Sequence, residues 1–234
     1  MRMKTKMIVF TMLLCPILIF GQTWDYPVKP GTEGWENMTY KEHIKAYNIP
    51  IDLLFKISTE NLLQTCLNYP EWRLINTYDD IEIGFMNVIS MFNGFEELFK
   101  REKSAYDLVN HYKMLEPFNV QKNWSDLQKG EYAFKILCAE LLLSHKSMVE
   151  QLDVEMLKSL LGEAVNKYDK KALLPDVYSI YSVMPTAILS LRAMDKLNST
   201  SSEYEKFKKT LYSTENNAIV KIQFIINQAK KELK

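Results

Sequence analysis

Residues Tyr132–Leu143, YAFKILCAELLL, constrain the fold of this chain more than any other stretch. Only Lys135 and Glu140 are charged in it, so a helix formed here is apolar on almost every side. The stretch is too short to cross a bilayer, which requires about 20 residues. Other helices of the same protein must therefore surround it. We predict a helical fold with this segment as its buried core.

Helix start and stop patterns follow one another along the rest of the chain. Thr39-x-x-Glu42 and Ser125-x-x-Gln128 are capping boxes, and Asp153 precedes leucines with helical spacing. The sequence has no strand pair joined by a hairpin turn and no alternation of strands with helices. We therefore predict an all-α single domain of about nine or ten helices, arranged as an irregular α-α array or a short solenoid-like stack.

Several local patterns predict helix ends within this domain. Asn93-Gly94 is expected to close the helix that begins near Asp80, and Ser104 is expected to cap the next one. Lys170-Lys171 is expected to close the helix after Asp153, where cations favour the helix dipole. In the apolar segment from Val177 to Leu197, Pro185 predicts a kink or break near Ser182–Met184. Ser202-x-x-Glu205 and Thr214 are expected to cap the last two helices.

The first 21 residues have the pattern of a signal peptide. A basic start with Arg2, Lys4 and Lys6 precedes the apolar run Met7–Phe20, and the small residue Gly21 follows. We predict a signal peptide over residues 1–21 and export to the periplasm or the medium; the alternative is a short N-terminal anchor. Cys15 does not predict a lipoprotein, because the bulky Leu14 precedes it.

Residues 22–38 are rich in proline and glycine, which predicts an extended N-terminal arm before a helical domain over residues 39–234. Trp24, Tyr26 and Trp35 are expected to pack the arm onto that domain, with a ligand-binding role as the alternative. Loss of residues 1–21 leaves a net charge of about −3 and no basic cluster. Binding to nucleic acid is therefore not expected, nor is a transmembrane span in the mature chain.

The mature sequence lacks the common catalytic and cofactor motifs. It has no nucleophile elbow, no glycine-rich phosphate loop and no C-x-x-C pair. His43, His111 and His145 are far apart and lack metal-ligand spacing. We therefore assign no catalytic, cofactor-binding or metal residues and expect no cofactor. Whether the protein is an enzyme stays open, with the balance against it.

A few polar residues could still carry chemistry. Asp79, Asp80 and Glu82 lie together at a helix start, where acids also favour the helix dipole; Glu96 and Glu97 form a second acidic pair. Glu140 lies in the apolar stretch and is interpreted either as a carboxylate that reaches solvent or a neighbouring helix end, or as a perturbed acid at a cleft. Cys66 and Cys138 are either buried thiols or one disulfide.

Two phrases support a family resemblance. Thr65–Pro70, TCLNYP, and Phe92–Arg101, FNGFEELFKR, together with the arm Tyr26–Trp35, resemble a group of secreted, all-helical proteins of Bacteroidales-type bacteria without an assigned activity. The resemblance implies export and a helical fold. It carries over no site residues.

Three hypotheses for function follow. The first is an exported, non-catalytic interaction or binding protein whose partner is another envelope protein or a glycan. The second is a carboxylate-based hydrolase acting on glycan or peptide through Asp79, Asp80 or Glu140. The third is a carrier with an apolar cavity for a small ligand.

Overall fold

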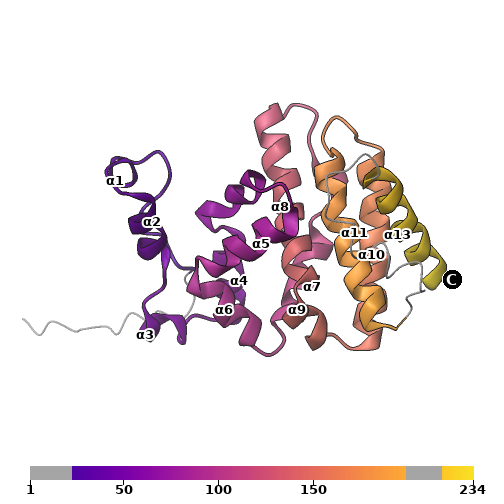
Figure 1. The fold of residues 1–234 in the computed structure, drawn as a ribbon, viewed down its shortest axis with the longest axis horizontal. Helices are drawn as coiled ribbons and strands as arrows, with labels where there is room; N and C mark the ends of the chain where they lie inside the picture. Colours follow the sequence, from indigo (N-terminus) through magenta and orange to yellow (C-terminus); the bar gives the residue numbers. More distant parts are fainter. Residues whose placement is uncertain (1–22, 199–217) are drawn as a thin grey trace, which may run out of the picture.

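The computed structural model describes residues 23–198 and 218–234, and within them every regular element is a helix (Figure 1). Twelve α-helices and two 3-10 helices are present there. The all-α class predicted from the sequence is confirmed. The predicted signal peptide, residues 1–21, and the predicted caps at Ser202 and Thr214 lie outside the described residues.

The elements follow in this order along the chain. The first half contains α1 (Glu33–Glu36), α2 (Tyr40–Tyr47), α3 (Ile51–Leu54), α4 (Thr59–Leu67), η1 (Pro70–Thr77), α5 (Ile81–Ser90), α6 (Asn93–Lys100) and α7 (Ser104–Met114). The second half contains η2 (Pro117–Asn119), α8 (Asp126–Ser144), α9 (Lys146–Gln151), α10 (Val154–Ala172), α11 (Ile180–Lys196) and α13 (Ala218–Glu232).

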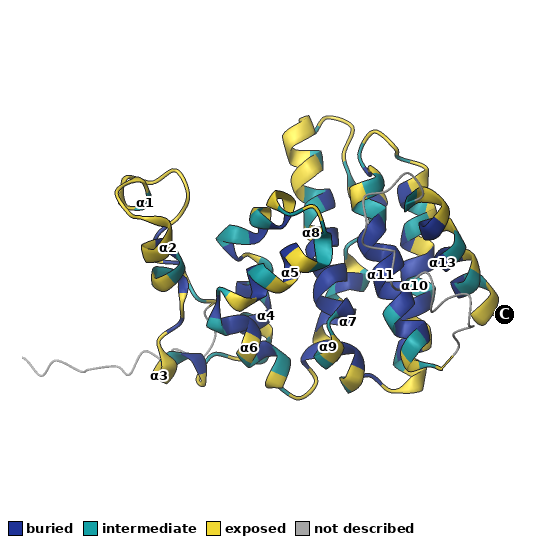
Figure 2. Cartoon of the chain, viewed as in Figure 1, coloured by how far each residue is buried: buried dark blue, intermediate teal, exposed yellow. Residues whose placement is uncertain are grey.

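Helices that are close in sequence lie side by side, from α1 and α2 at one end to α13 at the other (Figure 1). In the second half, α11 packs against α8, α10 and α13. The buried residues concentrate in α8, α10 and α11, while the first turns of α8 are exposed (Figure 2). In the described part of the chain, no helix is long and apolar enough to cross a membrane.

The predicted core segment is buried at Ala133 and then continuously from Ile136 onward. Every residue from 136 to 144 is buried, whereas Phe134 is half-buried and Lys135 is exposed. The helix begins at the predicted capping box, in which the Ser125 hydroxyl accepts from the Gln128 amide. The first turns of α8, up to Glu131, are therefore mostly exposed and extend beyond the core.

The prediction that Asn93-Gly94 closes a helix is wrong, because these residues begin α6. The preceding helix, α5, already ends at Ser90. The Asn93 side chain accepts from the Ile49 amide and donates to the Ile49 carbonyl, so it serves a contact distant in sequence. Gly94 is required for space, since a Cβ there would lie 2.3 Å from the Phe92 ring.

Ser104 is also not a cap, because it is the first residue of α7 and is buried. Its hydroxyl donates to Gln151 Oε1 at 3.2 Å, and the Ala105 amide donates to the same oxygen. The side chain of Gln151, at the end of α9, thus accepts hydrogen bonds from donors at the start of α7. This cap comes from a residue distant in sequence, so a local pattern cannot predict it.

Pro185 does not break its helix, because α11 is continuous from Ile180 to Lys196. The predicted break is therefore wrong. The helix starts at Ile180, so the carbonyl that Pro185 leaves without its usual partner belongs to Tyr181 in the first turn. Tyr181 is exposed, and a first-turn carbonyl at the surface can be hydrated.

The N-terminal arm packs onto the body through its aromatic residues, as expected. The Trp24 amide donates to Thr65 Oγ1, and the Trp24 indole donates to the Tyr47 carbonyl. The Tyr26 hydroxyl donates to the Thr65 carbonyl at 2.9 Å. The arm is not extended throughout, however, because α1 forms one helical turn capped by the Thr32 side chain.

Candidate functional site

Glu140 is fully buried and belongs to a polar cluster at the centre of the second half. Lys171 from α10 donates to Glu140 Oε1 at 2.9 Å and to Oε2 at 2.8 Å. The hydroxyls of Tyr112 from α7 and Thr186 from α11 donate to Glu140 Oε1 at 2.8 and 2.9 Å. The carboxylate therefore joins four helices.

Lys171 is bound as completely as Glu140. Its ammonium also donates to the Ser182 carbonyl and to Thr186 Oγ1, both at 2.9 Å. Burial lowers the pKa of Lys171, while the Glu140 carboxylate opposes that change. Burial raises the pKa of Tyr112 well above its ordinary value, and Glu140 adds to that effect. The helix does end beside Lys170 and Lys171, as predicted from the sequence, and Lys171 is fully buried in that last turn.

The cluster has the features of a structural ion pair. Neither charged group is exposed to solvent, and Glu140 lines none of the three surface hollows described below. A buried carboxylate requires a cation and hydrogen-bond donors, and all of these are present. Ser144, one turn further along, does not contribute, because its hydroxyl donates to the Leu141 carbonyl.

Most of the other candidate acids take part in a helix cap or an ion pair. Asp80 caps α5 by accepting from the Glu82 and Ile83 amides. Glu82 forms an ion pair with Arg192 at 2.8 Å, and Glu96 and Glu97 pair with Lys100 and Arg101 one turn away. Asp79 is exposed and lines a surface hollow.

The three histidines have different partners. His43 stacks on Trp35 at 4.5 Å, His111 contacts Gln64, and His145 stacks on Phe99 at 3.9 Å. Burial lowers the pKa of His111 and of His145. In residues 23–198 and 218–234, no group of three or more His, Cys, Asp or Glu side chains is placed to hold a metal ion.

Cys66 and Cys138 are both buried, and neither forms a disulfide in the structure. Burial raises the pKa of both thiols well above the usual value. Such thiols are poor nucleophiles at neutral pH, because the reactive form is the thiolate.

The main surface feature is a groove between η1 and α8. Two adjoining hollows of about 520 and 570 Å³ share Asn76, Gly130 and Phe134. Pro70–Thr77 forms one wall, the exposed half of α8 forms the other, and the start of α11 closes one end. We call this feature the η1–α8 groove.

The α8 wall of the groove is one face of a helix. Its lining residues fall at i, i+3, i+4, i+7, i+8 and i+11, the spacing of a helix face that packs against another element: Leu127, Gly130, Glu131, Phe134, Lys135 and Cys138. Leu127 is 67% exposed on this wall, and Tyr181 is 64% exposed at the α11 end. This face is exposed from Leu127 to Glu131 and becomes buried at Cys138.

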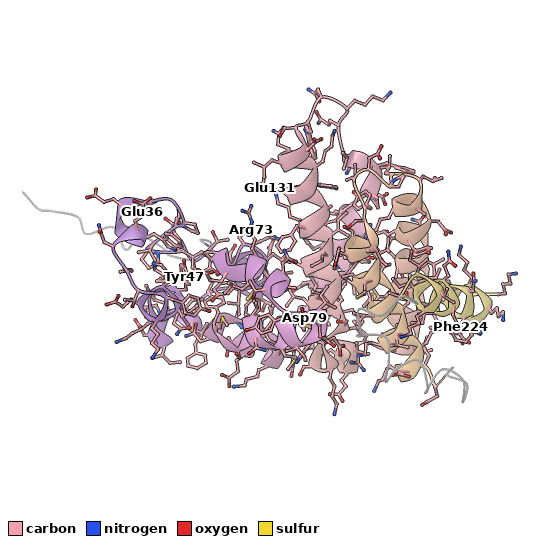
Figure 3. The ribbon with its side chains drawn as sticks, turned by 45° about the horizontal axis from the view of Figure 1, so that its top comes forward. Glu36, Tyr47, Arg73, Asp79, Glu131 and Phe224 are labelled. Carbon is pink, nitrogen blue, oxygen red and sulfur yellow. The ribbon has the colours of Figure 1, made fainter. Side chains whose placement is uncertain are left out.

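Charged side chains alternate around the groove. Arg73 from η1 and Glu131 from α8 lie 3.4 Å apart at its mouth, and both are exposed (Figure 3). Lys135 and Asp79 add one charge of each sign. The groove therefore has an apolar floor with a rim whose charges balance.

Gly130 lies at the centre of the groove, in the first half of α8. A Cβ at this position would meet no atom within 4 Å. Glycine inside a helix costs about 1 kcal/mol relative to alanine, and no contact of the described chain requires that cost here. Its absent side chain leaves room for close approach by something outside the chain.

A third hollow of about 740 Å³, larger than either hollow of the groove, lies between α5, α9 and α11 and is lined by Met86, His145 and the Glu82–Arg192 pair. The amide of Ser147 donates to Nδ1 of His145, so the proton of the neutral ring is on Nε2.

We assign the η1–α8 groove as the candidate site, because its helix face and its glycine both lack a role within the chain.

Among the groove residues, only Asp79 and Cys138 were considered for chemistry from the sequence. The helical spacing could have been extended upstream of Tyr132 to Leu127, which would have marked this face and Gly130. The comparisons add no relative: no family model matches the chain, and no curated protein or solved structure matches it either.

Proposed function

We propose that this chain is an exported, non-catalytic binding protein and that the η1–α8 groove is its binding surface for another macromolecule. The observation that carries the proposal is the uncovered face of α8, with exposed Leu127 and open Gly130 on one stripe. Export is supported by the basic and apolar pattern of residues 1–21. The resemblance to secreted proteins supports it as well.

The chemistry of the groove favours binding over hydrolysis. Glu140 and Asp80, two of the three acids in the hydrolase hypothesis, are bound in the cluster and in a helix cap. That hypothesis now depends on Asp79 with Glu131, and Glu131 is already paired with Arg73. If hydrolysis occurs, Asp79→Asn should abolish it without changing the melting temperature.

The carrier hypothesis requires an enclosed apolar cavity. The hollows described above are open grooves with charged rims rather than closed cavities. An open groove of this kind suits a macromolecular surface, because part of any occupant would stay in contact with solvent.

Site-specific photo-crosslinking can test the binding surface. A photo-crosslinking residue replaces Leu127 in α8, and the matched control replaces Val154 in α10. Both positions are exposed apolar residues in the first turn of a 19-residue helix, with exposures of 67% and 61%. After irradiation in envelope extract, we expect a discrete adduct from position 127 and none from position 154.

Equal labelling from both positions, or none from either, would contradict a binding role for the groove. Export is tested separately by expressing the chain with its native N-terminus in a Gram-negative host. We expect the mature protein outside the cytoplasm, with Gln22 as its first residue by mass spectrometry. A cytoplasmic chain that retains residues 1–21 would overturn the export proposal.

A further inference from the structure

The shape of the groove region points to a partner that carries a matching projection. The first turns of α8 stand out beyond the neighbouring helices and are exposed (Figures 1 and 2). The groove lies directly beside this projection, because the same turns form its wall. A projection and a groove on one surface can fit the same surface of a second copy, related by a two-fold axis.

The charges around the groove agree with such a pairing. An isologous interface brings each group of one copy against the symmetry-related surface of the other, so the surface must be complementary to itself. Arg73 and Lys135 provide two cations, and Glu131 and Asp79 provide two carboxylates. A partner of strong single charge would leave half of these groups facing a like charge.

Gly130 supports close contact between two helices at this place. It is central in the uncovered stripe, and the space where its Cβ would lie is open. A glycine at a helix crossing lets the two backbones approach more closely than any other residue allows. The exposed part of the stripe, from Leu127 to Lys135, covers about 12 Å of helix at 1.5 Å per residue, which is slightly more than two helical turns.

We propose that the η1–α8 groove seats the first turns of α8 from a second copy of this chain, forming a two-fold dimer in which Arg73 of each copy faces Glu131 of the other. This proposal rests on the proposed function, because it assumes that the groove is a docking surface. It names the partner as the chain itself. A different protein or a glycan in the groove is an outcome of the test below.

Sedimentation velocity of the purified full chain, from about 1 μM to about 100 μM, measures the self-association. We expect a shift from monomer to dimer within this range. Arg73→Glu and Glu131→Arg should each weaken the association by roughly tenfold or more, because each variant places like charges face to face. Both side chains are exposed, and unchanged melting curves would show that the variants are folded.

Mixing the two variants gives the decisive result. In a mixed dimer, Glu at position 73 of one copy faces Arg at position 131 of the other, and the second contact keeps the native Arg73 and Glu131. Association should therefore return to near the wild-type strength, although neither chain regains its internal pair. A wild-type chain that stays monomeric, single variants that associate normally, or a mixture that does not recover would each overturn the dimer.

The crosslinking experiment separates this failure from failure of the proposed function. An adduct from position 127 with the mass of two chains supports the dimer. An adduct of another mass, combined with a monomeric wild-type chain, overturns the dimer and leaves the groove as a binding surface. The absence of any adduct overturns both proposals.

Discussion

The two halves of the molecule hold their helices together by different means. The N-terminal half uses aromatic rings: Tyr26 meets Tyr47 edge to face at 5.6 Å, and Tyr69 stacks on Phe92 at 5.1 Å. The C-terminal half uses long helices around the Glu140–Lys171 pair. Short elements such as α1 and α3 offer little surface for helix packing, so large rings provide the contact area there.

The loss of stability that one substitution causes should differ between the two halves. Each ring contact is one of several and contributes about 0.5–1.5 kcal/mol beyond burial. The ion pair is a single unit, because removal of one partner leaves a buried charge without compensation. We call the contacting rings of Tyr26, Tyr47, Tyr69 and Phe92 the ring cluster. We therefore expect a single substitution in the ring cluster to lower the free energy of unfolding slightly, and a single substitution in the ion pair to lower it severely.

Glu140→Gln should have the largest effect. It leaves the Lys171 ammonium buried without its carboxylate, and breaking such a pair costs about 3–5 kcal/mol. Chemical denaturation measures the loss. The double variant Glu140→Leu with Lys171→Met should recover part of it, because apolar replacement of a buried pair is often neutral or stabilising, whereas the Tyr112 and Thr186 hydroxyls lose their acceptor. If Glu140→Gln unfolds at the wild-type midpoint, the contrast between the two halves is wrong.

High pH should destabilise the N-terminal half, where three buried tyrosines lie close together. Burial raises the pKa of Tyr47 to about 12, and burial also raises the pKa of Tyr26 and Tyr69. The folded chain therefore keeps protons that the unfolded chain loses above about pH 10. The stability that these groups provide is complete below about pH 10; the part tied to Tyr47 is lost as the pH rises through about 12, and the parts tied to Tyr26 and Tyr69 continue to be lost at higher pH.

Hydrogen exchange at increasing pH locates this loss. We expect faster exchange in α2 and α4 while α10 and α11 stay protected, once the intrinsic pH dependence is subtracted. Uniform loss of protection in all four helices would mean that the two halves unfold as one unit.

Within the ring cluster, Tyr47 and Tyr69 differ in the hydrogen bonds of their hydroxyl groups. The Tyr47 hydroxyl accepts from the Trp35 indole at 3.0 Å and donates to Glu71 at 3.1 Å. The buried Tyr69 hydroxyl has no hydrogen-bond partner in the described part of the chain. Tyr47→Phe should cost about 1–2 kcal/mol, whereas Tyr69→Phe should be neutral or stabilising. Thermal unfolding of both variants gives the test, and equal losses would contradict it.

The smallest effects concern two helical glycines. Gly130→Ala and Gly162→Ala should each stabilise the chain by up to about 1 kcal/mol, since both add helix propensity without a steric clash. Gly130→Ala should also weaken self-association, whereas Gly162→Ala, in α10, should not. Melting temperature and sedimentation of the two variants check this pair. A Gly130→Ala variant that associates as strongly as wild type would show that self-association does not require glycine at this position.

Local patterns in the sequence predict much of the fold. The capping boxes at Thr39 and Ser125 are present where the sequence places them, and the apolar stretch is the buried part of α8. Such features depend on residues within one or two turns of each other. The fold class follows from them, because the chain consists of consecutive helices.

The contacts that decide the polar cluster and the groove are not local. Glu140 lies 31 residues from Lys171 and 46 from Thr186, and Gln151 caps a helix that starts 47 residues earlier. Sequence spacing cannot bring such residues together without the fold. Arg73 and Glu131 likewise come from separate elements, so the groove mouth is visible only in three dimensions.

The Glu140–Lys171 pair also has a consequence for the order in which this chain can fold during synthesis. Glu140 is made before Lys171 and before Thr186, and all of its charged and hydroxyl partners except Tyr112 lie toward the C-terminus. Until those partners emerge, α8 cannot bury its carboxylate without a large desolvation cost. The buried part of α8 can therefore reach its final packing only after α10 and α11 have been made. Chains that end between α10 and α11 should remain open intermediates that are accessible to chaperones and proteases.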